Sequence, residues 1–123
     1  MTIKTIGFVA HDEKKSELVG WVEKNQAKLE QLSILSTGTT GGLIQEKCPQ
    51  LSIQRLKSGP LGGDQQLGAA ICEDRLDAMV FFIDPLSPHP HDVDVKALLR
   101  LAILYNVPFA CNLASADALL NLL

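Results

Sequence analysis

The sequence lacks the features that mark membrane, secreted and nucleic-acid-binding proteins. No uninterrupted apolar run approaches the ~20 residues that a membrane-spanning helix needs. The first ten residues, MTIKTIGFVA, have no small-residue cleavage site of the kind that ends a signal peptide. Basic runs are also missing, and the formal net charge is −3. Neither a nucleic acid nor a membrane is therefore an expected partner.

Cysteine is scarce and is not paired by spacing. The chain has three cysteines, Cys48, Cys72 and Cys111, an odd number with no CxxC motif. This usage favours reduced thiols that serve as small buried hydrophobic residues, and it predicts a cytoplasmic protein.

The sequence does contain a regular alternation of helix-type and strand-type apolar segments. Hydrophobic residues make up 46% of 123 residues, which predicts a single packed domain over residues 1–123. Helical spacing, carried first by Leu18, Val22, Leu29 and Leu32, alternates with short β-type segments. We expect strands at residues 3–10, 32–35, 51–56, 78–83 and 108–112, with later helices near 39–48, 65–74, 94–105 and 115–123. The pattern predicts an α/β fold, a three-layer α/β/α sandwich with a central five-stranded, mainly parallel sheet.

Polar and glycine-rich segments follow each predicted strand. In open α/β sheets, ligands bind at the carboxyl ends of the strands. One edge of the sheet should therefore gather the segments that come next, namely residues 11–12, 37–40, 58–64, 84–91 and Asn112.

The segment TGTTGG, residues 37–42, joins a predicted strand to a predicted helix. Threonine hydroxyls and free N–H groups at a helix start form an anion pocket, and the helix dipole favours negative charge there. Simple N-capping by Thr39 or Thr40 is the alternative interpretation. Lys15 would add a positive charge, unless it is only a solvated lysine, and Ser58 and Gly59 would add further donors. Together they predict a site for one phosphate group.

The segment SGPLGGDQQLG, residues 58–68, surrounds Asp64 with glycines. A surface turn is the simple interpretation, but the position at the ligand edge favours close approach of the backbone to a ligand, with Asp64 aimed at it. A histidine in a loop is more often a surface residue than a catalytic one, but a neutral imidazole that polarises a carbonyl is the functional interpretation of His91. A metal site in HPHDVD, residues 89–94, is not favoured by the spacing of His89 and His91. Asp92 or Asp94 can cap the helix that follows.

Five segments, FVAHD, STGTTG, SGPLGGDQQLGA, FFIDPL and PHDVDVKALLRLA, closely resemble the methylglyoxal synthases in order and spacing. The resemblance extends from about Ile6 to Ala116. It implies conversion of dihydroxyacetone phosphate to methylglyoxal and inorganic phosphate, by proton abstraction to an enediolate and phosphate elimination, without metal or organic cofactor. It also implies a homohexamer in which inorganic phosphate is both product and allosteric inhibitor.

The resemblance further implies roles for single residues. Asp64 would be the catalytic base, and His91 would act beside it on the substrate carbonyl. The matched substrate-binding positions are His11, Lys15, Thr37, Gly38, Thr39, Thr40, Ser58, Gly59 and His91. Further acidic positions of the site would be Asp12, Asp84 and Asp94.

The sequence departs from the pattern of this family at its C-terminal end. Family members usually continue past the last helix, with an extension that can carry an arginine towards a neighbouring subunit's phosphate site. No arginine follows Arg100 here, so we expect catalysis to persist without that contact and the allosteric coupling to phosphate to be weakened. The alternative function is a non-catalytic effector-binding domain, similar to the regulatory domain of carbamoyl-phosphate synthetase. Such a module would need the threonine pocket but could dispense with Asp64 and His91.

Overall fold

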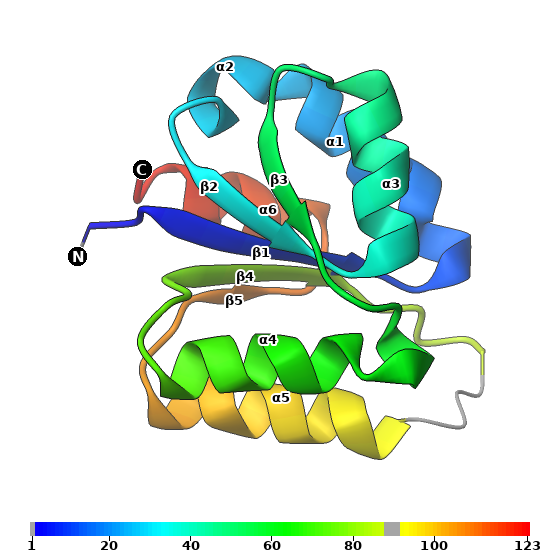
Figure 1. The fold of residues 1–123 in the computed structure, drawn as a ribbon, viewed down its shortest axis with the longest axis vertical. Helices are drawn as coiled ribbons and strands as arrows, with labels where there is room; N and C mark the ends of the chain where they lie inside the picture. Colours follow the sequence, from blue (N-terminus) through cyan, green and yellow to red (C-terminus); the bar gives the residue numbers. More distant parts are fainter. Residues whose placement is uncertain (1, 88–91) are drawn as a thin grey trace.

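A five-stranded parallel sheet forms the centre of the protein (Figure 1). The computed structural model describes residues 2–87 and 92–123. The strands occur in the order β3-β2-β1-β4-β5, and all four pairings are parallel. Their bounds are β1 Thr5–Ala10, β2 Ser33–Ser36, β3 Ser52–Arg55, β4 Ala78–Phe82 and β5 Phe109–Ala110.

Helices cover both faces of this sheet. The helices α1, α3 and α6 lie on one face, and α4 and α5 lie on the other (Figure 1). The α-helices are α1 Lys15–Lys24, α2 Gln26–Leu29, α3 Gly38–Lys47, α4 Gly63–Cys72, α5 Asp92–Leu104 and α6 Leu113–Leu120. Two 3-10 turns, η1 Asp12–Lys14 and η2 Gly59–Leu61, precede α1 and α4. The predicted three-layer α/β fold is confirmed.

The core consists of two apolar layers, one on each side of the sheet. Strand β4 explains why, because all five of its residues are buried and alternate residues point to opposite faces. Phe82 and Val80 pack with α1, α3 and α6, whereas Phe81 and Met79 pack with α4 and α5. A continuous apolar strand of this kind is typical of the centre of a parallel sheet.

The predicted first helix is interrupted at Asn25. Its backbone leaves the helical region at φ −114° and ψ 20°, and its side-chain amide donates to the carbonyl of Trp21 at 2.8 Å. Asparagine side chains compete for backbone groups in this way and end helices. Leu29 and Leu32 are buried as expected, but they lie beyond the break.

The starts of three other helices differ from the sequence-based expectation. Helix α4 begins at Gly63, two residues before the predicted start, and α6 begins at Leu113. Asn112 does not join the fifth strand; it caps α6 in a capping box with Ser115. Asp92 and Asp94 lie inside the first turn of α5, so neither residue is its N-cap.

The three cysteines differ in exposure. Cys48 is fully buried, Cys111 is half-buried and Cys72 is exposed at the end of α4. The expectation of buried thiols is therefore right for Cys48 and wrong for Cys72. Burial raises the pKa of the Cys48 thiol, and the nearby Glu23 carboxylate raises it further.

The helices are short relative to the thickness of a lipid bilayer. Within residues 2–87 and 92–123, no helix is both long and apolar enough to span a membrane.

Candidate active site

A cavity of about 430 Å³ opens at the carboxyl ends of β1, β2, β3 and β4. The sheet order reverses between β1 and β4, and such switch points are where α/β sheets bind ligands. Most of the predicted site residues line this cavity: His11, Asp12, Lys15, Thr37, Thr39, Thr40, Ser58, Gly59, Asp64 and Asp84. Gly38 is not part of the lining but lies against Ser58, and Asp94 lines a neighbouring groove. His91 lies outside the described residues.

The amino end of α3 forms one wall of the cavity. Thr37 is the N-cap residue, so the interpretation of Thr39 or Thr40 as the cap is wrong; both stand in the first helical turn. The N–H groups of a first turn have no acceptor within their helix and carry the positive end of its dipole. The Thr40 side chain is 1% exposed, and its Oγ1 has no hydrogen-bond partner among the described residues. This wall can therefore bind the oxygens of an anion.

Residues 58–60 line a second wall of the cavity, and two contacts of Gly38 hold this wall close to the start of α3. The Gly38 N–H donates to the carbonyl of Lys57 at 3.2 Å. A Cβ at Gly38 would lie 3.3 Å from Ser58 N and 3.4 Å from Ser58 Oγ. The Ser58 hydroxyl therefore packs against the start of α3, where it can join the threonines around one anion.

The glycine loop sets the position of Asp64. Gly62 has φ +112°, a left-handed conformation that side chains rarely adopt, and it turns the chain into α4. A Cβ at Gly63 would lie only 2.0 Å from the carbonyl oxygen of Lys57, so this backbone approach requires glycine. A Cβ at Gly59 would lie 3.4 Å from Asp64 Oδ1. The Asp64 side chain is 4% exposed and borders the cavity.

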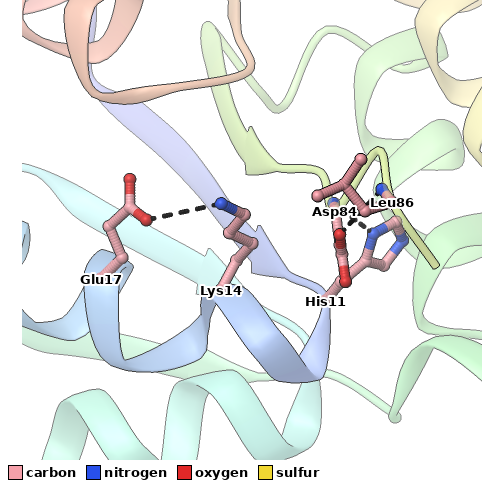
Figure 2. Close-up of polar contacts among 5 residues, drawn as sticks. All are labelled: His11, Lys14, Glu17, Asp84 and Leu86. Atoms are coloured by element: carbon pink, nitrogen blue, oxygen red, sulfur yellow. Dashed lines mark hydrogen bonds and ion pairs between the residues drawn. The ribbon is translucent and has the colours of Figure 1, made fainter.

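His11 is held in a defined tautomer. The backbone N–H of Asp84 donates to His11 Nδ1 at 2.9 Å, as Figure 2 shows. A ring nitrogen that accepts a hydrogen bond carries no proton, so the ring proton is on Nε2. The Phe81 ring meets the imidazole edge-on, with 5.2 Å between centroids. His11 thus brings a neutral imidazole with a donor N–H to the cavity.

Asp84 orients the loop that follows β4. Its carboxylate accepts the backbone N–H of Leu86 at 3.0 Å, while its own N–H is used by His11 (Figure 2). The loop is thereby fixed to the end of β1, and Asp84 itself lines the cavity.

Lys15 supplies positive charge to the same cavity. Its side chain is 16% exposed and pairs with the Asp12 carboxylate, which is 91% exposed. Its neighbour Lys14 instead pairs with Glu17 at 3.7 Å on the helix surface (Figure 2). Of the two lysines, Lys15 is the one that lines the cavity, so its interpretation as a solvated lysine is not supported.

Asp94 stands apart from the other acidic candidates. It lines a groove of about 210 Å³ between α4 and α5, which Asp64 also borders. The side-chain amide of Gln65 donates to Asp94 Oδ1 at 2.9 Å. Asp94 therefore lies behind Asp64 rather than in the cavity wall.

Several residues that line the cavity were not predicted from the sequence. These are Val9, Ala10, Glu13, Pro60, Phe81 and Ser87. Pro60 and Phe81 belong to the segments SGPLGGDQQLGA and FFIDPL. Pro60 follows Gly59 and Phe81 lies near the end of β4, and these positions could have predicted both residues as part of the site. Glu13 and Ser87 carry no pattern of their own.

The described residues contain no evident metal-binding cluster. In this part of the chain, no group of three or more histidine, cysteine, aspartate or glutamate side chains lies close enough to hold a metal ion. His89 and His91 of the HPHDVD segment lie outside those residues.

Comparison with known proteins gives a consistent result. The family model described as MGS-like domain matches residues 17–111. Methylglyoxal synthase from Oleidesulfovibrio alaskensis is 57% identical over 118 residues, covering 96% of this chain and 80% of that protein. Methylglyoxal synthase from Hahella chejuensis is 56% identical over 119 residues, covering 97% and 77%.

Solved structures agree with the sequence comparisons. The crystal structure of methylglyoxal synthase from Elizabethkingia anophelis superposes with a TM-score of 0.89 at 50% identity, covering 96% of this chain and 77% of that one. Identity at this level over nearly the whole chain, together with the matched family model, shows that the chain belongs to the methylglyoxal synthase family.

Proposed function

We propose that this chain is a carbon–oxygen lyase that converts dihydroxyacetone phosphate to methylglyoxal and inorganic phosphate, with residues 1–123 acting as one domain. Relatives more than 50% identical carry the name methylglyoxal synthase. The observation that carries the proposal is the buried Asp64 carboxylate, which shares one cavity with the amino end of α3. A base and an anion site then act on the two ends of one small molecule.

The substrate phosphate binds at the amino end of α3. First-turn N–H groups and the Thr40 hydroxyl donate to its oxygens, with Thr37, Gly38 and Thr39 shaping the turn. Lys15 balances the phosphate charge, and Ser58 and Gly59 close the other side. Such sites use helix N-termini because charge and free donors coincide there.

Asp64 takes a proton from the hydroxymethyl carbon of the bound ketone. The electron pair of that C–H bond moves into the bond to the carbonyl carbon, and negative charge develops on the carbonyl oxygen. The His11 Nε2–H is a neutral donor for that oxygen, and His91 is assigned the same role from the family resemblance. Fixed donors at a developing oxyanion often contribute more to the rate of such reactions than any other single effect.

The enediolate then expels the phosphate. The hydroxyl on the former hydroxymethyl carbon loses its proton, and the oxygen left behind forms the aldehyde carbonyl. The C=C bond shifts to join the central carbon to the phosphate-bearing carbon, and the C–O bond breaks with its electron pair on phosphate, which takes up the released proton. Protonation of the resulting enol at carbon gives methylglyoxal. The C–O bond must stand roughly perpendicular to the enediolate plane, so the relative placement of base and phosphate site decides the outcome.

The proposal extends to assembly and regulation. The family resemblance implies a homohexamer. The exposed apolar residues of α5 and the turn after it, including Ile103, Leu104 and Tyr105, offer a surface for contacts between copies of the chain. Inorganic phosphate, as the product, competes at the α3 site and also serves as the allosteric inhibitor that the family resemblance implies. The enzyme acts in the cytoplasm and uses neither metal nor organic cofactor.

The experiment is turnover of dihydroxyacetone phosphate by the purified chain. Methylglyoxal is read with a dicarbonyl trap and phosphate release is measured in parallel, before and after exhaustive chelation. We expect both products in a 1:1 ratio, with no loss on chelation. Binding of phosphate without any turnover would instead favour the effector-binding alternative.

A further inference from the structure

The two walls of the cavity meet at the backbone of Lys57. Its carbonyl accepts the N–H of Gly38 at the start of α3, at 3.2 Å. Its own N–H donates to the side-chain oxygen of Gln66, at 2.8 Å. The backbone bond between Leu56 N and Ser36 O, at 2.7 Å, comes just before this point in the chain. Lys57 therefore connects the anion wall to α4.

Gln66 belongs to the same helical turn as Asp64. The Gln66 N–H donates to the carbonyl of Gly62 at 3.0 Å, which is the first hydrogen bond of that turn. Asp64 lies between these two residues, so its backbone moves with theirs. A bond from the Gln66 side chain to Lys57 therefore fixes Asp64 relative to Gly38.

We propose that Gln66 is a positioning residue that sets the spacing between the Asp64 carboxylate and the phosphate site at the start of α3. This inference rests on the function proposed above. Gln66 is exposed, so burial in the core does not explain it. What its side chain provides is an acceptor for the Lys57 N–H, and it ties the catalytic helix to the loop by a route separate from the glycine contacts.

The rate of the proposed reaction depends on the spacing between the Asp64 carboxylate and the phosphate site. One group must remove a proton at one carbon while the phosphate on another carbon is held out of the enediolate plane. A misplacement of about 1 Å can cost about 100-fold in rate even when binding survives. Losing the Gln66 link should therefore lower kcat far more than it changes the affinity for phosphate.

The test compares three variants. Gln66→Met keeps the length of the side chain and removes the acceptor, and Gln66→Glu keeps an acceptor oxygen at the same reach. Gln45→Met is the matched control, because Gln45 is also a helical glutamine whose side chain bonds to β3, donating to the Ile53 carbonyl at 3.3 Å. Gln45 lies outside the cavity lining.

Three quantities are measured on each variant. Hydrogen exchange of the Lys57 amide reports the bond itself, titration with inorganic phosphate reports the anion wall, and turnover of dihydroxyacetone phosphate gives kcat and KM. For Gln66→Met we expect rapid Lys57 exchange, a kcat about 10- to 100-fold lower, and phosphate affinity within about threefold of wild type. Gln66→Glu should restore both protection and most of kcat, and Gln45→Met should leave both unchanged.

Two results would overturn the inference. The first is Gln66→Met with unprotected Lys57 but wild-type kcat, which would show that the link does not place Asp64. The second is Gln66→Met with no change in Lys57 exchange. Absence of turnover in the wild type contradicts the proposed function instead, and is thus distinguished from a failure confined to Gln66.

Discussion

The protonation state of His11 follows from the hydrogen bond that it accepts from Asp84 N. The bond keeps the proton on Nε2, the nitrogen that can serve as a donor to a substrate oxygen. The sequence placed His11 at the end of a strand but could not reveal this tautomer, because the donor comes from a loop 73 residues later in the chain.

A pair of substitutions separates the two nitrogens of His11. Asn at this position can accept the Asp84 N–H but provides no donor at the place of Nε2. Gln can place an amide N–H donor at the position of Nε2 but provides no acceptor at the place of Nδ1. We expect His11→Asn to fold normally and lose about 100- to 1,000-fold in kcat, since it removes one oxyanion donor. His11→Gln should lose less in kcat and more in melting temperature. Steady-state kinetics and thermal melts measure both, and the opposite ranking in kcat would exclude the donor role of His11.

The amino ends of α3 and α4 form two walls of the cavity that we propose as the active site. The sequence predicted both helices, but it placed the start of α4 at Gln65 rather than Gly63. Glycine is a poor helix former, so GGD is interpreted as a loop from propensity alone. The backbone bond from Gly63 N to Ser58 O, at 2.9 Å, and the close approach to Lys57 are tertiary contacts that outweigh that propensity.

Gly63→Ala tests whether this approach sets the start of α4. A Cβ would lie 2.0 Å from the Lys57 carbonyl oxygen, so the loop must move and Asp64 with it. We expect the free energy of unfolding to fall by about 1–3 kcal/mol, as in overpacked sites, and kcat to fall at least 10-fold. Thermal melts and turnover of dihydroxyacetone phosphate are the measurements.

Gly20→Ala is the matched control for that substitution. Gly20 is an exposed residue of α1, and a Cβ there meets nothing within 4 Å. This substitution should stabilise the protein by about 0.5–1 kcal/mol, since alanine is the better helix former, and leave turnover unchanged. Equal behaviour of the two variants would contradict the account of the glycine loop.

At the scale of the whole molecule, the site is a consequence of the strand order. Polar segments after four of the five strands meet in one cavity, as expected from a parallel sheet. Asn112, after the fifth strand, was expected there too, but it caps α6 instead. Side-chain pairings such as Gln65 with Asp94 depend on how α4 and α5 pack. The spacing of residues along the chain does not predict this packing.

The net charge of −3 does not attract an anionic substrate, so the affinity for phosphate must come from local features. The amino end of α3 and Lys15 supply them on one wall, and the buried Asp64 carboxylate faces the same cavity from α4. The proposed anion site and the proposed base, Asp64, therefore lie together on one edge of the sheet. The central claim is that this pairing performs proton abstraction followed by phosphate elimination.

Asp64→Asn tests that claim most directly. The substitution preserves shape but removes the proton acceptor, and the measurement is turnover of dihydroxyacetone phosphate with phosphate binding followed in the same samples. We predict that kcat falls by at least about 100- to 10,000-fold while the protein stays folded and still binds inorganic phosphate. Turnover close to wild type in Asp64→Asn would contradict the account, because the proton would then leave to another group.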